Sequence, residues 1–186
     1  MSHKKGFTLI ELLIVVAIIG ILAALLIPNA ITAIQKGKQK STMKDIITIA
    51  TGSADWITDH GAWAAATPPL TNAGALTGPT DPFVLAISPF YVKIVPARDS
   101  WGQFYEVYLG TGAAVFGIAS TEVGSDDFVL ASGGRNRTVV PEPAAFDQNN
   151  PEASIYTLNT MADFDNDLVN WSGSWIIAPR TAKAIS

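Results

Sequence analysis

The sequence has no cysteine and few charged residues, and both absences exclude whole classes of protein. Without cysteine among its 186 residues, the chain cannot form a disulfide scaffold, an iron–sulfur cluster, a Cys-ligated zinc site or a catalytic thiol. His3 and His60 are the two histidines, and no Walker or dinucleotide-binding glycine pattern occurs. A composition of 48% hydrophobic and 15% charged residues also excludes wholesale disorder. We therefore expect one globular domain, or two small ones, with a role other than catalysis.

The charges that are present are distributed unevenly. Through Lys44, six lysines stand against the single Glu11, a net charge of +5. From Asp45 onward, six basic residues stand against fifteen acidic ones, a net charge of −9. Because an acidic domain binds polyanions poorly, we expect no nucleic acid as a partner. The lysines flank an apolar run on both sides, which indicates a membrane segment.

Residues 7–27 form this apolar run, and its one charge is Glu11. At ~1.5 Å per residue, a helix of that length is about 31 Å long and can cross a bilayer core. Lys4 and Lys5 precede the run, which predicts a cytoplasmic start and a single pass. A secretory signal cut near Ala30, or a plain anchor, are the ordinary interpretations.

Glu11 argues against both of these interpretations. A carboxylate inside a membrane helix costs about 2.5–3.5 kcal/mol on insertion scales and is normally kept for a function. The remaining alternative is an interfacial glutamate whose carboxylate reaches the membrane surface.

The segment Lys4–Leu12 (KKGFTLIEL) resembles the processing site of type IV pilins and type II secretion pseudopilins, and the match extends to Pro28. This resemblance implies that a prepilin peptidase cleaves between Gly6 and Phe7 and that Phe7 is then N-methylated. It also implies that Glu11, Phe7 and Pro28 take part in the assembly of a helical filament.

The same resemblance implies partners and a location. The subunit would be held in the bacterial inner membrane before assembly, with its C-terminal domain in the periplasm, and the filament would be periplasmic or extracellular. The partners would be copies of itself, the prepilin peptidase and N-methyltransferase, the inner-membrane platform, the assembly ATPase and the minor pseudopilins. The chain would comprise a leader peptide (1–6), a helix (7–60, with the transmembrane and assembly segment at 7–27) and a periplasmic globular domain (61–186).

The charges of this N-terminus suggest how Glu11 acts. Cleavage after Gly6 removes Lys4 and Lys5 and leaves a cationic amine on Phe7. A carboxylate buried in an apolar bundle needs a partner, and the amine of a neighbouring copy can supply one. We therefore expect Glu11 to fix the register between subunits.

The remaining sequence predicts an α+β fold. Apolar residues at helical spacing continue past Pro28, and His60 followed by Gly61 predicts a helix end, so one helix should run from Phe7 to about Asp59. Pro28 predicts a kink in it. Further along, the pattern predicts three strands and a long, irregular tail. The strands are Gln103–Leu109, Ala113–Ser120 and Phe128–Ala131, and the tail is 133–186. With the resemblance, this is the pilin fold, in which a small antiparallel sheet lies on the C-terminal half of the helix.

Two other segments, Asp99–Tyr105 and Asp163–Trp171, resemble the major pseudopilin of type II secretion systems, whose C-terminal loop binds calcium. Asp163, Asp165 and Asp167 offer the oxygen ligands that Ca²⁺ prefers. An EF-hand is excluded because Leu168 stands where such a loop needs glycine.

The resemblance adds ligands from the turn after the third strand, where Leu130 and Ser132 would contribute carbonyl or hydroxyl oxygens. Arg135 stands near the place where the family's turn carries an aspartate. We expect calcium as a structural cofactor that restricts the tail of a chain without disulfides. A solvated acidic loop is the alternative.

These observations support three functional hypotheses. The first is a structural subunit of a pseudopilus that drives protein export through a type II secretion system. The second is a major type IV pilin for adhesion or twitching motility. The third is a periplasmic enzyme on an uncleaved anchor.

Overall fold

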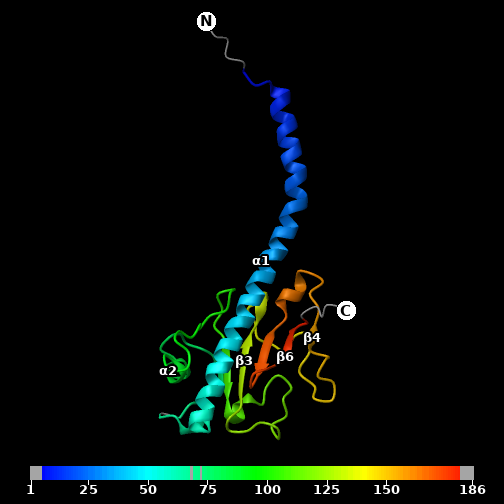
Figure 1. The fold of residues 1–186 in the computed structure, drawn as a ribbon. Helices are drawn as coiled ribbons and strands as arrows, with labels where there is room; N and C mark the ends of the chain where they lie inside the picture. Colours follow the sequence, from blue (N-terminus) through cyan, green and yellow to red (C-terminus); the bar gives the residue numbers. More distant parts are fainter. Residues whose placement is uncertain (1–5, 68, 72, 181–186) are drawn as a thin grey trace, which may run out of the picture. The chain divides into compact units, whose positions relative to one another are not determined.

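The computed structural model describes residues 6–67, 69–71 and 73–180, and contacts divide the chain into two units after Gly37. The predicted long helix is confirmed as α1 (Leu9–His60), a helix of 52 residues whose N-terminal part forms the first unit. The second unit contains the rest of α1, the short helix α2 (Pro82–Ile87) and a six-stranded sheet (Figure 1). The α+β class predicted from the sequence is therefore confirmed.

Helix α1 ends where the sequence predicts. The N–H of Gly61 donates to the carbonyl of Ile57, and Gly61 has φ +84°, a left-handed conformation that glycine adopts without strain. The helix continues through Pro28, whose carbonyl accepts a hydrogen bond from the Thr32 hydroxyl at 3.0 Å. The side-chain amide of Asn29 donates to the carbonyl of Leu25 in the same turn.

The sheet has the strand order β1-β2-β3-β5-β6-β4. Its neighbours pair antiparallel, except that β4 is parallel to β6. Leu130 lies opposite Val107 on one side and Asn170 on the other, and Ser132 lies opposite Leu168. The turn after β3 and the turn before β5 therefore lie at the same end of the sheet. The strands are β1 (Ala73–Ala75), β2 (Glu106–Leu109), β3 (Phe128–Ser132), β4 (Ile155–Tyr156), β5 (Leu168–Trp171) and β6 (Ser174–Pro179).

The side chains of β3 alternate between two apolar clusters. The first cluster joins Ile46, Ile49 and Trp56 of α1 to Val107 and Leu130 of the sheet, and Figure 1 shows this part of α1 lying across the strands. The predicted packing of the sheet on the C-terminal half of the helix is thus confirmed. The second cluster contains Val129, Ala131, Val169, Ile176, Ile177, Phe116 and Ile118. Because both faces of β3 are covered, all of its residues are buried.

The predicted strand Ala113–Ser120 is wrong. Ala113 ends a 3₁₀ turn, η2 (Gly110–Ala113), and the residues after it form turns. Phe116 and Gly117 have φ values of +56° and +92°, which reverse the backbone, and the Phe116 carbonyl accepts the N–H of Phe146. The apolar residues of this segment cover the second cluster without pairing with a strand.

The predicted irregular tail is also wrong in part, because it contains β4, β5 and β6. Ser172 and Gly173 join β5 to β6, and both have positive φ, as a two-residue hairpin turn requires. The strand predicted to start at Gln103 starts instead at Glu106, since Phe104 forms only an isolated bridge with Arg98.

Candidate functional site

The predicted processing site lies at the start of the described chain. Gly6 and Phe7 precede α1, Phe7 is 84% exposed, and a Cβ added at Gly6 would meet nothing within 4 Å. The peptide bond between them is therefore accessible in the single chain. Residues 1–5, which include the predicted leader lysines Lys4 and Lys5, lie outside the described residues.

Thr8 and Glu11 form a reciprocal cap on the first turn of α1. The Glu11 carboxylate accepts the backbone N–H of Thr8 at 2.8 Å and the Thr8 hydroxyl at 2.7 Å. The Thr8 oxygen in turn accepts the N–H of Glu11 at 3.3 Å. This is the capping box that the sequence T-x-x-E encodes, and it satisfies N–H groups that a helix start leaves free. The T-x-x-E spacing is the sequence signal that gives Thr8 this role.

The large apolar side chains of the predicted assembly segment are not covered by other described residues. Every large apolar side chain from Phe7 to Ile27 is exposed. Within the described chain, α1 is the helix long and apolar enough to cross a membrane, and its most apolar window is not buried at all. An unbroken apolar surface of this size requires lipid or another protein surface to cover it.

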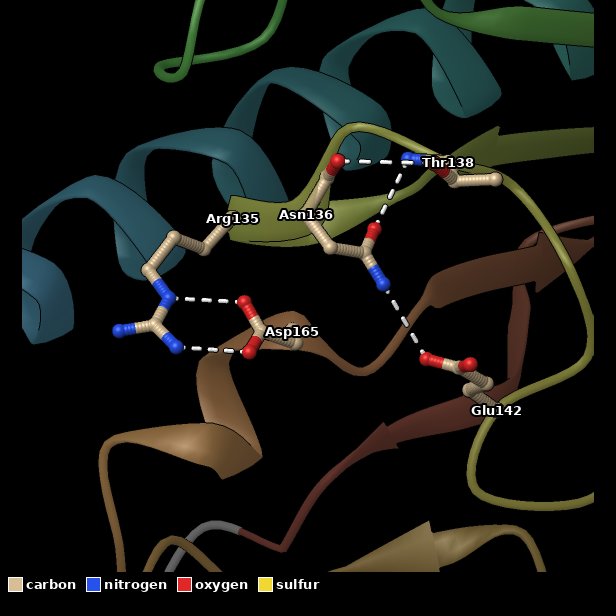
Figure 2. Close-up of polar contacts among 5 residues, drawn as sticks. All are labelled: Arg135, Asn136, Thr138, Glu142 and Asp165. Atoms are coloured by element: carbon tan, nitrogen blue, oxygen red, sulfur yellow. Dashed lines mark hydrogen bonds and ion pairs between the residues drawn. The ribbon is translucent and has the colours of Figure 1, made fainter.

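Apart from Leu130, the residues predicted to bind calcium lie at the end of β3 and in the turn before β5, at one end of the sheet. Asp165, at the end of the turn η4 (Ala162–Asp165), accepts two bonds from the guanidinium of Arg135 in the turn η3 (Gly134–Asn136). Figure 2 shows the two side chains meeting edge to edge. The carboxylate raises the pKa of Arg135 through these bonds, so the guanidinium stays charged.

Asp163 faces its own turn. One of its carboxylate oxygens accepts the backbone N–H groups of Asn159 and Thr160 at 2.7 and 2.6 Å. These bonds, chiefly the one from Thr160, hold the pKa of Asp163 below its usual value.

Asp167 is completely buried, and both of its carboxylate oxygens lack a hydrogen-bond partner among the described residues. Burial, aided by the negative charge of Glu142, raises its pKa to about 8, and the nearby amides of Glu142 and Val140 oppose this rise only in part. Its backbone is better satisfied, because its N–H donates to the Glu142 carbonyl and its carbonyl accepts the Tyr156 hydroxyl.

Ser132 already has hydrogen-bond partners within the protein, and Leu130 is buried in the sheet. The Ser132 hydroxyl donates to the buried carboxylate of Asp99 at 2.8 Å, and its oxygen accepts the N–H of Gly134. The other oxygen of Asp99 accepts the N–H groups of Trp101 and Gln103. Leu130 is buried in the middle of β3. The resemblance gives Asp99 no role of its own. In the structure, its carboxylate accepts hydrogen bonds from three residues and so holds the backbone at this end of the sheet.

In the arrangement that the structure shows, the residues predicted to bind calcium do not form a calcium site. The structure does not bring the three aspartates together, and within residues 6–67, 69–71 and 73–180 no group of three acidic or histidine side chains could hold a metal. Asp167 offers two buried oxygens without a hydrogen-bond partner among the described residues, whereas Ca²⁺ takes six to eight oxygen ligands. Calcium binding remains a prediction from the resemblance.

Comparisons with known proteins give similarity over part of the chain. Residues 1–27 match the family model of the prokaryotic N-terminal methylation motif. The chain is 32% identical to the type II secretion system core protein G of Vibrio cholerae serotype O1 over 116 residues, 60% of this chain and 75% of that protein. It is 32% identical to the core protein G of Escherichia coli K12 over 109 residues, 56% of this chain and 71% of that protein.

Similarity to a pilin is present as well. The chain is 37% identical to the type IV major pilin protein PilE1 of Neisseria gonorrhoeae over 100 residues, which are 52% of this chain and 53% of that pilin. The comparison with solved structures found no match.

Proposed function

This chain belongs to the family of the type II secretion system core protein G, and from that premise we propose that it is the structural subunit of a helical pseudopilus that drives protein export. The observation that carries the proposal is the apolar surface of α1, which stays exposed from Phe7 to Ile27 in the single chain. Lipid can cover this surface before assembly, and the same segment of neighbouring copies can cover it in a filament.

The N-terminus of the mature subunit follows from the methylation motif. A prepilin peptidase and N-methyltransferase would cleave between Gly6 and Phe7 and methylate the amine of Phe7. The position of this bond before α1 and the exposure of Phe7 support this step.

In the filament, the Glu11 carboxylate would pair with the Phe7 amine of a neighbouring copy. In the single chain Thr8 already holds this carboxylate, so assembly exchanges one partner for another and leaves no charge unpaired. In a subunit displaced along its neighbour, the Glu11 carboxylate and the Phe7 amine would both be buried without a partner. Burying unpaired charges costs about several kcal/mol. The pairing would thus set the register.

We propose the location and the partners of the subunit on the same basis, its similarity to pseudopilins. The subunit would be stored in the inner membrane by one pass of residues 7–27, with the domain from 61 onward in the periplasm. An inner-membrane platform, an assembly ATPase and minor pseudopilins would drive and start polymerisation. The relatives named above are a secretion-system core protein and a major pilin, so we propose a structural role and no catalysis.

A major type IV pilin is the second candidate, because 52% of the chain is similar to the type IV major pilin protein PilE1. Deleting the gene separates the two. Retention of exported proteins inside the cell supports the pseudopilus, and loss of surface pili with normal export supports the pilin. Complementation with the wild-type gene, and with a Glu11→Ala gene as a negative control, ties either phenotype to this chain.

A further inference from the structure

The turn after β3 and the turn before β5 are joined by a cation that belongs to the protein. We infer that the guanidinium of Arg135 takes the place that the resemblance assigned to calcium, binding Asp165 and so restricting the loop between these two turns. This inference does not depend on the proposed function.

The geometry of the pair is suited to this task. Nε of Arg135 donates to Oδ1 of Asp165 at 2.7 Å, and Nη2 donates to Oδ2 at 2.6 Å (Figure 2). Two parallel bonds between planar groups fix orientation as well as distance. The two residues are 30 positions apart in the sequence, so the pair closes a long loop.

The backbone places the two turns against each other. Gly134 has φ +58°, and a Cβ on it would lie 2.7 Å from the carbonyl oxygens of both Phe164 and Asn166. There is consequently no room for a side chain at position 134. This contact directs Arg135, the next residue, toward Asp165.

The same arrangement disfavours a divalent ion. The guanidinium already uses both oxygens of Asp165, and a second cation beside it would be repelled. Asp163 is engaged by the backbone of its own turn, and the Ser132 hydroxyl donates to Asp99. Both oxygens of Asp165, one oxygen of Asp163 and the Ser132 hydroxyl thus already have partners within the protein.

Hydrogen bonds of Asn136 hold the first residues of the loop as well. The amide of Asn136 donates to the carboxylate of Glu142, and its oxygen accepts the N–H of Thr138 (Figure 2). The start of the loop is therefore fixed to the same turn that carries Arg135. The ion pair of Arg135 with Asp165 and the hydrogen bonds of Asn136 together restrict the loop at 137–164, in a chain that has no cysteine to form a disulfide.

The test uses thermal unfolding of the full chain in detergent micelles, with excess EDTA and with added calcium chloride. We expect the same midpoint in both. Arg135→Gln should lower the midpoint by about 2–4 °C and make the loop at 137–164 more sensitive to protease. Asp165→Asn should have the same effect, and the double variant should lose no more than either single one. Arg135→Lys should be intermediate, because it keeps the charge and loses the planar fork.

The matched control is the ion pair of Arg180 with Glu152, whose side chains are 50% and 74% exposed, against 34% and 31% for Arg135 and Asp165. Arg180→Gln should leave the midpoint almost unchanged. The inference is overturned if EDTA lowers the wild-type midpoint, if calcium raises it, or if Arg135→Gln is as harmless as Arg180→Gln.

Discussion

The Glu11 carboxylate is held by Thr8 of the same chain, through the backbone N–H at 2.8 Å and the hydroxyl at 2.7 Å. An isolated subunit therefore keeps its one acidic group in the apolar segment hydrogen-bonded before any neighbour arrives. The two roles of Glu11, capping the helix and pairing with a neighbour, can be separated by substitution.

We expect Glu11→Ala to abolish filament assembly or slow it severely, because the Phe7 amine of each neighbour loses its partner. Membrane insertion should be unaffected, since the substitution makes the segment more apolar. Electron microscopy of sheared filaments and alkaline extraction of membranes measure the two properties.

Thr8→Val is the comparison variant. It removes the hydroxyl that caps the helix and leaves the carboxylate and the amine in place, so filaments should still form. Normal filaments from Glu11→Ala would contradict the pairing, and a loss of filaments from Thr8→Val would show that the cap itself is needed for assembly.

Gly52 and Gly37 of α1 differ in the space around them, so alanine should have different effects on stability at the two positions. A Cβ on Gly52 would lie 2.2 Å from the Cγ2 of Val92, a buried and stiff side chain. Overpacking of this kind costs about 1–3 kcal/mol, which should exceed the ~1 kcal/mol that alanine gains in a helix. Gly52→Ala should therefore lower the free energy of unfolding.

Gly37→Ala is the matched control, because a Cβ there would meet nothing within 4 Å. It should be neutral or stabilising by up to about 1 kcal/mol. Denaturant unfolding of both variants measures the difference, and equal stabilisation by the two would contradict the contact with Val92.

The bond from Ser132 to Asp99 predicts the effect of Ser132→Ala. Asp99 is buried, and the substitution leaves its Oδ2 without the hydroxyl that donates to it. Removing the partner of a buried polar group costs about 1–3 kcal/mol, more when the group is charged. Denaturant unfolding should show a loss in this range, and an unchanged midpoint would mean that Asp99 finds another donor.

Local signals in the sequence predicted the helix correctly. The apolar period and the pair His60-Gly61 fixed the extent of α1, and the Thr8-to-Glu11 spacing carried a capping signal that could have been used. The hairpin β5–β6 could also have been found, because Ser172-Gly173 between two apolar runs is a two-residue turn signal.

Other features depended on contacts between distant residues. The segment Ala113–Ser120 is an apolar run bounded by glycine-rich turns, yet it contributes side chains to the second cluster and is not one of the strands of the sheet. The pairing of Arg135 with Asp165 joins positions 30 apart, and no local pattern predicts that these two residues pair. The same holds for the buried chain of bonds from Gln39 through Tyr156 to the Asp167 carbonyl.

The buried carboxylate of Asp167 predicts a dependence of stability on pH. Its pKa rises from 3.8 in the unfolded chain to about 8 in the folded one, mainly because burial disfavours the charge. The unfolded state therefore loses this proton first, and the contribution to stability falls as pH increases from about 4 to about 8.

Asp167→Asn should remove this dependence, because the amide resembles the protonated acid at every pH. The variant should be more stable than the wild type at about pH 9 and similar to it at about pH 4. Denaturant unfolding at the two pH values provides the measurement. A wild-type contribution that stays constant between them would mean that Asp167 has a partner in solution.

The most direct measurement for the account as a whole is the mass of the N-terminal peptide of the protein isolated from its filaments. We predict a chain that begins at Phe7 and carries one methyl group on its amine. A chain that begins at Met1, or at a cut beyond Ala30, would contradict the account, because no Phe7 amine would then exist for Glu11 to bind.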